Sequence, residues 1–204
     1  MGLSHVLKIG IFGGAFDPPH FGHMALAQAA IEQLQLDALH IIPTGSAWHK
    51  DRPLSDPEHR LEMCRLAFAD ITCAVINDCE TLRSGPSYTM DTLEHLRSQF
   101  PAAQFFLLVG QDQAMHLSEW HRAKEIPRLA IIAVASRSLS VDAVSTVGNE
   151  IDAFFAIKRL EMPAMPQSST QIRSCVQHNT RIDSLVCKPV ARYIANHQLY
   201  RMAR

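Results

Sequence analysis

GIFGGAFDPPHFGH, at residues 10–23, is the stretch that decides the fold of this chain and most of its chemistry. The apolar run Val6–Phe12 is typical of a buried strand, and the paired glycines predict a tight turn that two prolines stiffen. His20 and His23 fall in the first turn of the helical pattern that follows, three residues apart and therefore on one face. Because free N–H groups and the helix dipole attract anions there, the pattern predicts a phosphate site with two imidazoles.

SSTQIR, at residues 168–173, offers related chemistry near the C-terminus. Serine and threonine favour a helix N-cap, and their hydroxyls together with open N–H groups can hold phosphate oxygens. Arg173 follows within one helical turn, where its planar guanidinium can reach the same anion. Such a stretch alone is typical of an ordinary capped surface helix, but together with the first motif it indicates a second half of one phosphate site.

Composition limits the class of protein. With 204 residues, 47% of them hydrophobic, the chain can bury a full core, and we expect one domain over residues 1–204 that ends in helices at about 165–204. The formal net charge of −1 provides no basic field, so nucleic acid is not an expected partner. The five cysteines form no CxxC pair, which indicates reduced thiols. The eleven histidines include no HExxH motif, which argues against a structural zinc site.

Neither a membrane span nor a secretion signal is expected. No uncharged apolar stretch of the sequence approaches the ~18–20 residues that a transmembrane helix needs. The apolar run near the N-terminus is short and contains Lys8, unlike a signal peptide. We therefore expect a cytoplasmic protein without membrane contact. A homo-oligomer is compatible with the sequence, which leaves the oligomeric state open.

Strand-like and helix-like stretches alternate along the chain. Apolar runs predict strands at residues 6–12, 38–43, 71–76, 104–110, 129–135 and 154–160. Helical periodicity predicts helices at residues 21–36, 57–69, 89–100, 169–178 and 187–198, short helices over 111–128, and a loop or short helix at 138–150. This order indicates an α/β fold with a Rossmann-like, doubly wound, mainly parallel sheet and helices on both faces. Both phosphate stretches follow strands, so we expect them to meet at the carboxyl ends of the strands.

The glycine-rich stretch differs from the two commonest nucleotide-binding motifs. GxGxxG does not follow the first strand and GxxxxGK[ST] does not occur, which argues against a typical dehydrogenase and a P-loop NTPase. The stretch instead resembles the GxFDPxHxGH signature of the nucleotidyltransferases that move adenylyl or cytidylyl groups. Residues 168–173 resemble their (I/V)SSTxIR motif, with Gln167 where an aliphatic residue is usual.

Interior segments are similar to one branch of that superfamily, the bacterial nicotinate-nucleotide adenylyltransferases. The segments that carry the likeness are IIP at 41–43, His49-Lys50, ETLRSGPSYT at 80–89, GQD at 110–112, Trp120 and the terminal LYR at 199–201. The resemblance therefore covers nearly the whole chain. It implies transfer of AMP from ATP to nicotinate mononucleotide, giving nicotinate adenine dinucleotide and pyrophosphate in NAD biosynthesis.

The resemblance also implies the mechanism and its metal ion. The mononucleotide phosphate would attack the α-phosphorus of ATP in line, so positioning and charge neutralisation suffice without a protein nucleophile. Mg²⁺ would bridge phosphate oxygens, and because it retains waters we expect no protein ligand for it.

Site residues are assigned by the same resemblance. The catalytic groups would be His20, His23, Lys50 and Arg173. Further ATP contacts would come from Gly13, Gly14, Phe16, Arg137, Ser168, Ser169 and Thr170. The mononucleotide would contact His49, Tyr88, Thr89, Asp112, Trp120 and His121. Arg137 stands between two serines where the branch usually has Arg-Pro-Gly.

Several of these residues also have simpler interpretations. Lys50 suits a solvated surface loop, Thr89 suits a helix N-cap, and a tryptophan such as Trp120 more often packs beside a helix. As functional groups, Lys50 would neutralise the triphosphate and Trp120 would stack on the pyridine ring. Asp112, at a strand end, would accept hydrogen bonds from ribose hydroxyls.

Other functions stay open, among them another nucleotidyltransferase of the same superfamily, of which a cytidylyltransferase is favoured least. Pantetheine-phosphate adenylyltransferase shares the first motif, but that family is usually shorter and the SYT, GxD and Trp120 segments argue against it. The chain could also be a non-catalytic nucleotide-binding module, although the joint presence of both histidines, Lys50 and Arg173 favours turnover. Nicotinate and nicotinamide are isosteric, and backbone N–H groups around Thr89 favour the acid.

Overall fold

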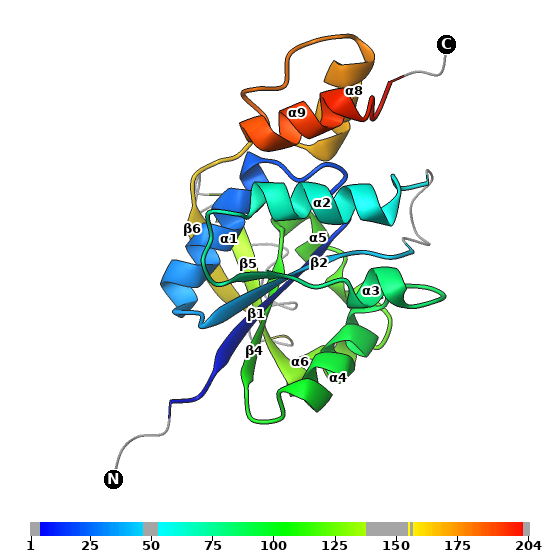
Figure 1. Cartoon of the computed structure of the whole chain (residues 1–204). Coiled ribbons are helices and arrows are strands. Elements are labelled where there is room, and N and C mark those ends of the chain that lie inside the picture. Colours follow the sequence, from blue (N-terminus) through cyan, green and yellow to red (C-terminus); the bar gives the residue numbers. More distant parts are fainter. Residues whose placement is uncertain (1–4, 47–52, 138–154, 156, 202–204) are drawn as a thin grey trace.

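One parallel sheet organises residues 5–46, 53–137, 155 and 157–201, the part of the chain that the computed structural model describes (Figure 1). Its strands are β1 (Lys8–Gly14), β2 (Ala38–Pro43), β3 (Ala74–Ile76), β4 (Gln104–Val109), β5 (Ala130–Arg137) and β6 (Lys158–Met162). The order across the sheet is β3-β2-β1-β4-β5-β6, and each neighbouring pair is parallel. This order confirms the predicted doubly wound α/β fold. It places the switch in winding direction between β1 and β4, where such sheets bind ligands.

Helices pack on both faces of the sheet. They are α1 (Phe21–Leu34), α2 (Pro57–Ala67), α3 (Cys79–Leu82), α4 (Thr89–Gln99), α5 (Gln111–Ala114), α6 (Ile126–Leu129), α8 (Ser169–Gln177) and α9 (Lys188–Asn196), with 3₁₀ turns η1 (Leu117–Glu119) and η2 (Ala123–Glu125). In β4, Phe106 and Leu108 join a core cluster with α1, α2, α8 and α9, whereas Phe105 and Leu107 join a second cluster with α4, α5 and α6. The two cores follow from the alternation of side chains along each strand.

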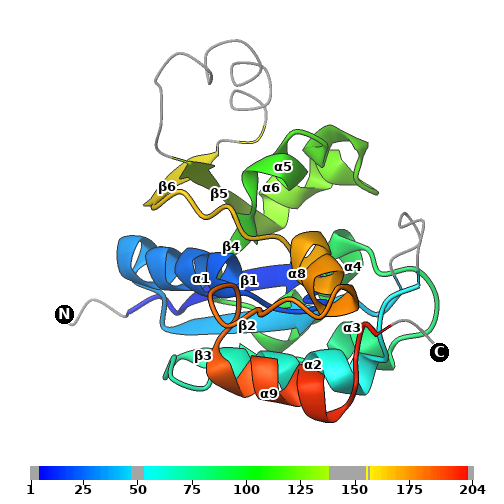
Figure 2. The same ribbon diagram turned by 90° about the horizontal axis from the view of Figure 1, so that it is seen from above.

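The C-terminal part of the chain returns to the start of α1. Figure 2 shows the segment after β6 leading past α1 to α8, and α9 then lies beside α2. The backbone N–H of Phe21, the first residue of α1, donates to the carbonyl of Leu185 at 3.1 Å. Residues far apart in sequence are thereby brought to the end of β1.

The tight turn after β1 is not made by its glycines, so that prediction was wrong. Gly13 and Gly14 are the last residues of β1 and pair with Ile42 and Pro43 in register. The left-handed residue is Phe16, with φ of 46°, and the following Asp17-Pro18 peptide is cis. The Phe16 ring is only 1% exposed and packs edge-on against Phe12, 5.3 Å between ring centroids. Burial of this ring offsets the backbone strain, while Gly13 keeps open space where a Cβ would lie.

Strand boundaries differ from the pattern at both edges of the sheet. The strand expected at 71–76 begins only at Ala74, because Ile71 closes a turn with its carbonyl accepting the Ala74 N–H at 3.0 Å. The strand expected at 154–160 begins at Lys158, and Phe155 is buried in the second core cluster instead. Apolar residues beside an edge strand can fill the core without joining the ladder. The stretch 138–150 lies outside the described residues. Within the described chain, no helix has the length and apolar character to cross a membrane.

Candidate active site

His20 and His23 form a stacked pair at the start of α1. His20 is the N-cap residue, with extended backbone, and its N–H donates to Nδ1 of His23 at 3.2 Å. The two ring centroids are 3.7 Å apart with 31° between planes. His20 is 8% exposed, and burial lowers its pKa to about 4, so the imidazole is neutral at pH 7. Within the described residues, its buried Nδ1 atom has no hydrogen-bond partner. The pair therefore places a neutral imidazole at the N-terminus of α1.

The C-terminal motif contacts the loop that leads to this pair. The Oγ hydroxyl of Ser169 donates to the carbonyl of Pro18 at 2.9 Å, and Nη1 of Arg173 donates to the carbonyl of Asp17 at 2.8 Å. Nη2 of Arg173 donates to the Thr170 hydroxyl at 3.1 Å. Ser168 is the N-cap of α8, as expected from the sequence. The two stretches therefore meet at the carboxyl end of β1.

Asp17 is a buried carboxyl group at the centre of this contact. The hydroxyl of Tyr200 donates to its Oδ1 at 2.7 Å, and the backbone N–H of Ser55 donates to its Oδ2 at 3.2 Å. Burial raises the pKa of Tyr200, so its hydroxyl keeps its proton at neutral pH. The loop after β1 is thus tied both to the segment before α2 and to the C-terminus.

A second group of predicted residues lies at the start of α4. Tyr88 is the N-cap residue of α4, and its ring stacks on His121 with centroids 4.2 Å apart and 27° between planes. Trp120 is half-buried against the second core cluster, and Asp112 is exposed in the first turn of α5. The structure therefore brings Tyr88 and His121 together from separate elements.

Glu80 holds the segment before α4 against the loop after β2. Its side chain is 6% exposed, and Oε1 accepts the Thr92 hydroxyl at 2.7 Å. The Ser87 hydroxyl accepts the N–H groups of Gly45 and Ser46 at 3.1 and 3.2 Å. Burial raises the pKa of Glu80, while hydrogen bonds and nearby charge oppose that shift. These contacts fix the backbone just before Tyr88.

Comparisons with known proteins identify the relatives of this chain. The cytidylyltransferase-like family model matches residues 11–175. A relative from Albidiferax ferrireducens, named probable nicotinate-nucleotide adenylyltransferase, is 48% identical, with 96% of this chain and 99% of the relative covered. A relative of the same name from Methylibium petroleiphilum is 38% identical, with 100% and 97% covered. The chain belongs to the nicotinate-nucleotide adenylyltransferase family.

Solved structures share the fold of this adenylyltransferase. The nicotinic acid mononucleotide adenylyltransferase of Plasmodium falciparum, complexed with NaAD, superposes with a TM-score of 0.78 at 19% identity, covering 95% of this chain and 97% of that one. A putative nicotinate-nucleotide adenylyltransferase from Vibrio parahaemolyticus gives a TM-score of 0.68 at 20% identity, covering 97% and 98%. At such identities the likeness shows the fold alone.

Some residues expected in the adenylyltransferase site cannot be placed. His49 and Lys50 lie outside the described residues, and Arg137 is described only as the backbone end of β5. Among the residues that are described, no group of three His, Cys, Asp or Glu side chains is arranged to hold a metal ion.

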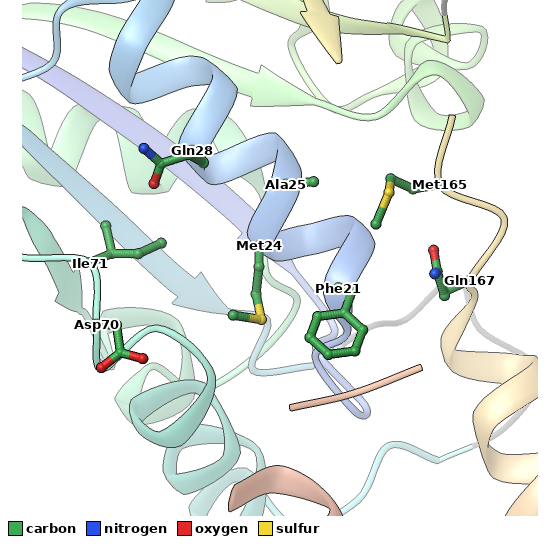
Figure 3. A pocket seen from close by; sticks show the side chains of 8 residues that line it. All are labelled: Phe21, Met24, Ala25, Gln28, Asp70, Ile71, Met165 and Gln167. Atoms are coloured by element: carbon green, nitrogen blue, oxygen red, sulfur yellow. The ribbon is translucent and has the colours of Figure 1, made fainter. Parts of the chain in front are cut away.

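A pocket of about 490 Å³ is lined by residues of α1, by Asp70 and Ile71, and by the segment before α8 (Figure 3). Figure 3 shows Met165 and Gln167, from the segment before α8, opposite Phe21 and Met24 of α1. The Oε1 atom of Gln167 is buried there without a partner in the described part of the chain. Neither His20 nor His23 lines this pocket, but Phe21 of the first motif and Gln167, directly before the second, do.

Sequence reasoning missed Arg60, Tyr200 and Glu80 as contributors to the adenylyltransferase site. All three are polar groups with buried or half-buried side chains; Arg60 and Tyr200 contact residues far away in sequence, whereas Glu80 binds Thr92 of α4. A signal existed for Arg60, because it shares the helical spacing of the buried residues Met63, Cys64 and Ala67. A charged residue on the apolar face of a helix indicates a buried hydrogen-bond network.

Proposed function

We propose that the chain moves AMP from ATP to nicotinate mononucleotide, producing nicotinate adenine dinucleotide and pyrophosphate. The observation that carries the proposal is the contact of Arg173 and Ser169 with the carbonyls of Asp17 and Pro18, beside the stacked His20 and His23. Two helix N-termini and two imidazoles then face one place, which suits a polyphosphate. Membership of the family supports the choice of mononucleotide.

Catalysis in this proposal consists of positioning and charge stabilisation. The mononucleotide phosphate attacks the α-phosphorus of ATP, and pyrophosphate leaves on the opposite side. The transfer of AMP therefore needs no covalent enzyme intermediate. Arg173 would hold phosphate oxygens with its planar guanidinium. His20 enters the reaction neutral, because its pKa is about 4, and binds oxygen through a ring N–H or takes up a proton as the polyphosphate arrives.

The segment around Tyr88 and Trp120 would bind the mononucleotide base. The Tyr88–His121 stack forms a planar wall, and the N–H groups at the start of α4 can donate to a carboxylate. A carboxamide would present an NH₂ group to the same donors, so the acid is the expected substrate.

We also propose that Mg²⁺ enters with ATP. Such an ion is held by phosphate oxygens and retains its waters, so it needs few protein ligands. Bound Mg²⁺ would neutralise part of the polyphosphate charge. Chelation of the ion should abolish turnover, and activity at full rate in excess EDTA would contradict this.

A cytoplasmic location completes the proposal. All five cysteines belong to the described residues and are free thiols, Cys64 being fully buried. Reduced cysteines in this number are typical of a protein that works in a reducing compartment. Reaction of the unfolded, unreduced protein with a thiol reagent should count five thiols.

Pyrophosphate release is the decisive assay. The purified protein is mixed with ATP and Mg²⁺ and with nicotinate mononucleotide, nicotinamide mononucleotide or 4′-phosphopantetheine. Rapid release with the first acceptor supports the proposal. Turnover only with phosphopantetheine would assign the pantetheine branch, and absence of turnover with every acceptor would indicate a non-catalytic nucleotide-binding module.

A further inference from the structure

Helix α2 carries an arginine whose side chain is wholly buried. Arg60 is 0% exposed, although guanidinium groups are strongly hydrated in the unfolded chain. Burial lowers its pKa from the ordinary value, and the charge of Asp17 is the largest influence in the opposite direction. Its Nη2 atom is buried without a hydrogen-bond partner among the described residues. An apolar residue would suit this helix face better, so stability alone does not account for Arg60.

The guanidinium joins three segments of chain through their carbonyl oxygens. Its Nε donates to Ser55 at 2.8 Å, and its Nη1 donates to Thr44 at 2.6 Å and to Ala15 at 3.2 Å. Ala15 belongs to the phosphate motif, Thr44 follows β2 and Ser55 precedes α2. The Thr44 N–H also donates to the Gly14 carbonyl at 2.8 Å, so Thr44 is held on both sides of its backbone.

Asp17 holds the same segment from the other side. Its Oδ2 accepts the Ser55 N–H while the Ser55 carbonyl accepts from Arg60, so both backbone polar groups of Ser55 are used. Oδ1 of Asp17 accepts the Tyr200 hydroxyl. A continuous chain of contacts runs from Arg60 through Ser55 and Asp17 to Tyr200. Asp17, in this chain, lies three residues before His20.

We propose that Arg60 and Tyr200 are positioning residues for adenylyl transfer. In this proposal they act through the backbone of residues 15–17, which they fix, and through it on the place of His20. The inference rests on the proposed function, because its measure is the rate of that reaction. A displacement of about 1 Å in a positioned group can cost on the order of 100-fold in rate, so loss of a positioning contact should appear in kcat.

Arg60→Lys is the direct test. Lysine keeps the charge but has a single nitrogen, which cannot replace donors at both Nε and Nη1. We expect kcat to fall about 10- to 100-fold, while KM for ATP and for the mononucleotide changes less than about threefold. The matched control is Arg65→Lys, because Arg65 lies on the same helix but is exposed and forms an ion pair with Glu62 at 3.1 Å. The control should keep the kcat of the parent protein.

Kinetics are measured well below the unfolding midpoint of each variant, with the folded fraction determined by circular dichroism. A folded Arg60→Lys protein with parental kcat would overturn the inference, and so would a loss of rate that matches the unfolded fraction. If the parent protein itself shows no turnover, the proposed function fails first. The two failures are therefore distinguishable.

Tyr200→Phe keeps the inference testable if Arg60→Lys does not fold. This change removes one hydroxyl donor to Asp17 and leaves Arg60 in place. We expect kcat to fall about 3- to 10-fold without a change in KM, as for loss of one hydrogen bond of about 1 kcal/mol. The matched control is Tyr193→Phe, since the Tyr193 hydroxyl bonds His59 at 2.9 Å, away from the phosphate motif. Equal kcat for both phenylalanine variants would overturn the inference.

Discussion

Two loops that follow neighbouring strands are each held by a buried carboxyl group, but with different partners. After β1, Asp17 binds Tyr200, which is 183 residues away, and lies near the charge of Arg60. After β2, the backbone of Gly45 is held by the Ser87–Glu80 group, in which Glu80 binds Thr92 only 12 residues away. The first loop is held by Tyr200 near the C-terminus, and the second by the hydroxyl group of Ser87, 42 residues from Gly45. The loop after β1, where phosphate is expected to bind, should therefore depend on contacts with distant parts of the chain. The segment held by Glu80, where the mononucleotide is expected to bind, should depend on pH.

The largest expected effect is at the β1 loop. His20→Ala and His23→Ala each remove an imidazole beside the phosphate motif, and we expect kcat to fall about 10²–10³-fold. His95→Ala is the control, since His95 is exposed on α4 and its ring contacts the Gln99 side chain at 3.2 Å. Steady-state pyrophosphate release measures kcat, and circular dichroism checks the fold. Parental kcat in both histidine variants would remove this loop from the mechanism.

The preference between acid and amide tests the proposed acceptor pocket around residues 88–121. We expect kcat/KM for nicotinate mononucleotide to exceed that for the amide by roughly 10- to 100-fold, because an unsatisfied buried polar group costs about 1–3 kcal/mol. Trp120→Ala should raise KM for the mononucleotide more than KM for ATP, because only the pyridine ring would lose a stacking surface. Initial rates with each acceptor provide the measurement. Equal values for acid and amide would mean that residues 88–121 do not form the acceptor pocket.

Arg173→Lys addresses the link between the two phosphate stretches. The guanidinium donates through Nη1 to Asp17 and through Nη2 to Thr170, and a lysine can supply only one such nitrogen. We expect kcat/KM for ATP to fall about tenfold, in line with loss of one hydrogen bond to a charged group. An unchanged kcat/KM for ATP in Arg173→Lys would mean that the C-terminal motif serves only to cap a helix.

The smallest effect concerns Glu80 and pH. Because burial raises the pKa of Glu80, the folded state binds its proton more tightly than the unfolded state does. The ionised side chain therefore costs stability above its folded pKa, and this cost disappears as pH falls toward the unfolded value of 4.5. Glu80→Gln should raise the free energy of unfolding at pH 7 by on the order of 1 kcal/mol, with the gain shrinking toward pH 4.5. Urea unfolding at several pH values measures it. A gain that grows on acidification would contradict the assignment.

The regular elements could be predicted because their signals are local. β2 has the bounds Ala38–Pro43 that its apolar run predicts, and α4 and α8 end within one residue of their predicted limits. The meeting of the two phosphate stretches also followed from the sequence, since both come after strands of one parallel sheet.

The hydrogen-bond network of Arg60, Asp17 and Tyr200 could not be predicted, because its partners are distant in sequence and many of its acceptors are backbone atoms. Arg60 binds three carbonyl oxygens, which carry no side-chain signature in the sequence. Phe16 adopts a left-handed backbone beside two glycines because its ring is buried, which depends on the finished core. The Tyr88–His121 stack joins two loops whose approach depends on how α4 and η1 pack.

Gly45 has a consequence for how mutational data on this chain will look. A Cβ at this position would overlap the carbonyl oxygen of Glu80, so even alanine must displace backbone. Gly45 contributes no side chain to binding or to chemistry. In a saturation scan scored by growth or by product formed, substitutions at position 45 will nonetheless score as damaging as those at the histidines. Abundance measured in the same library separates the two cases, because a substitution at Gly45 should lower the amount of folded protein, whereas one at His23 should lower only its rate.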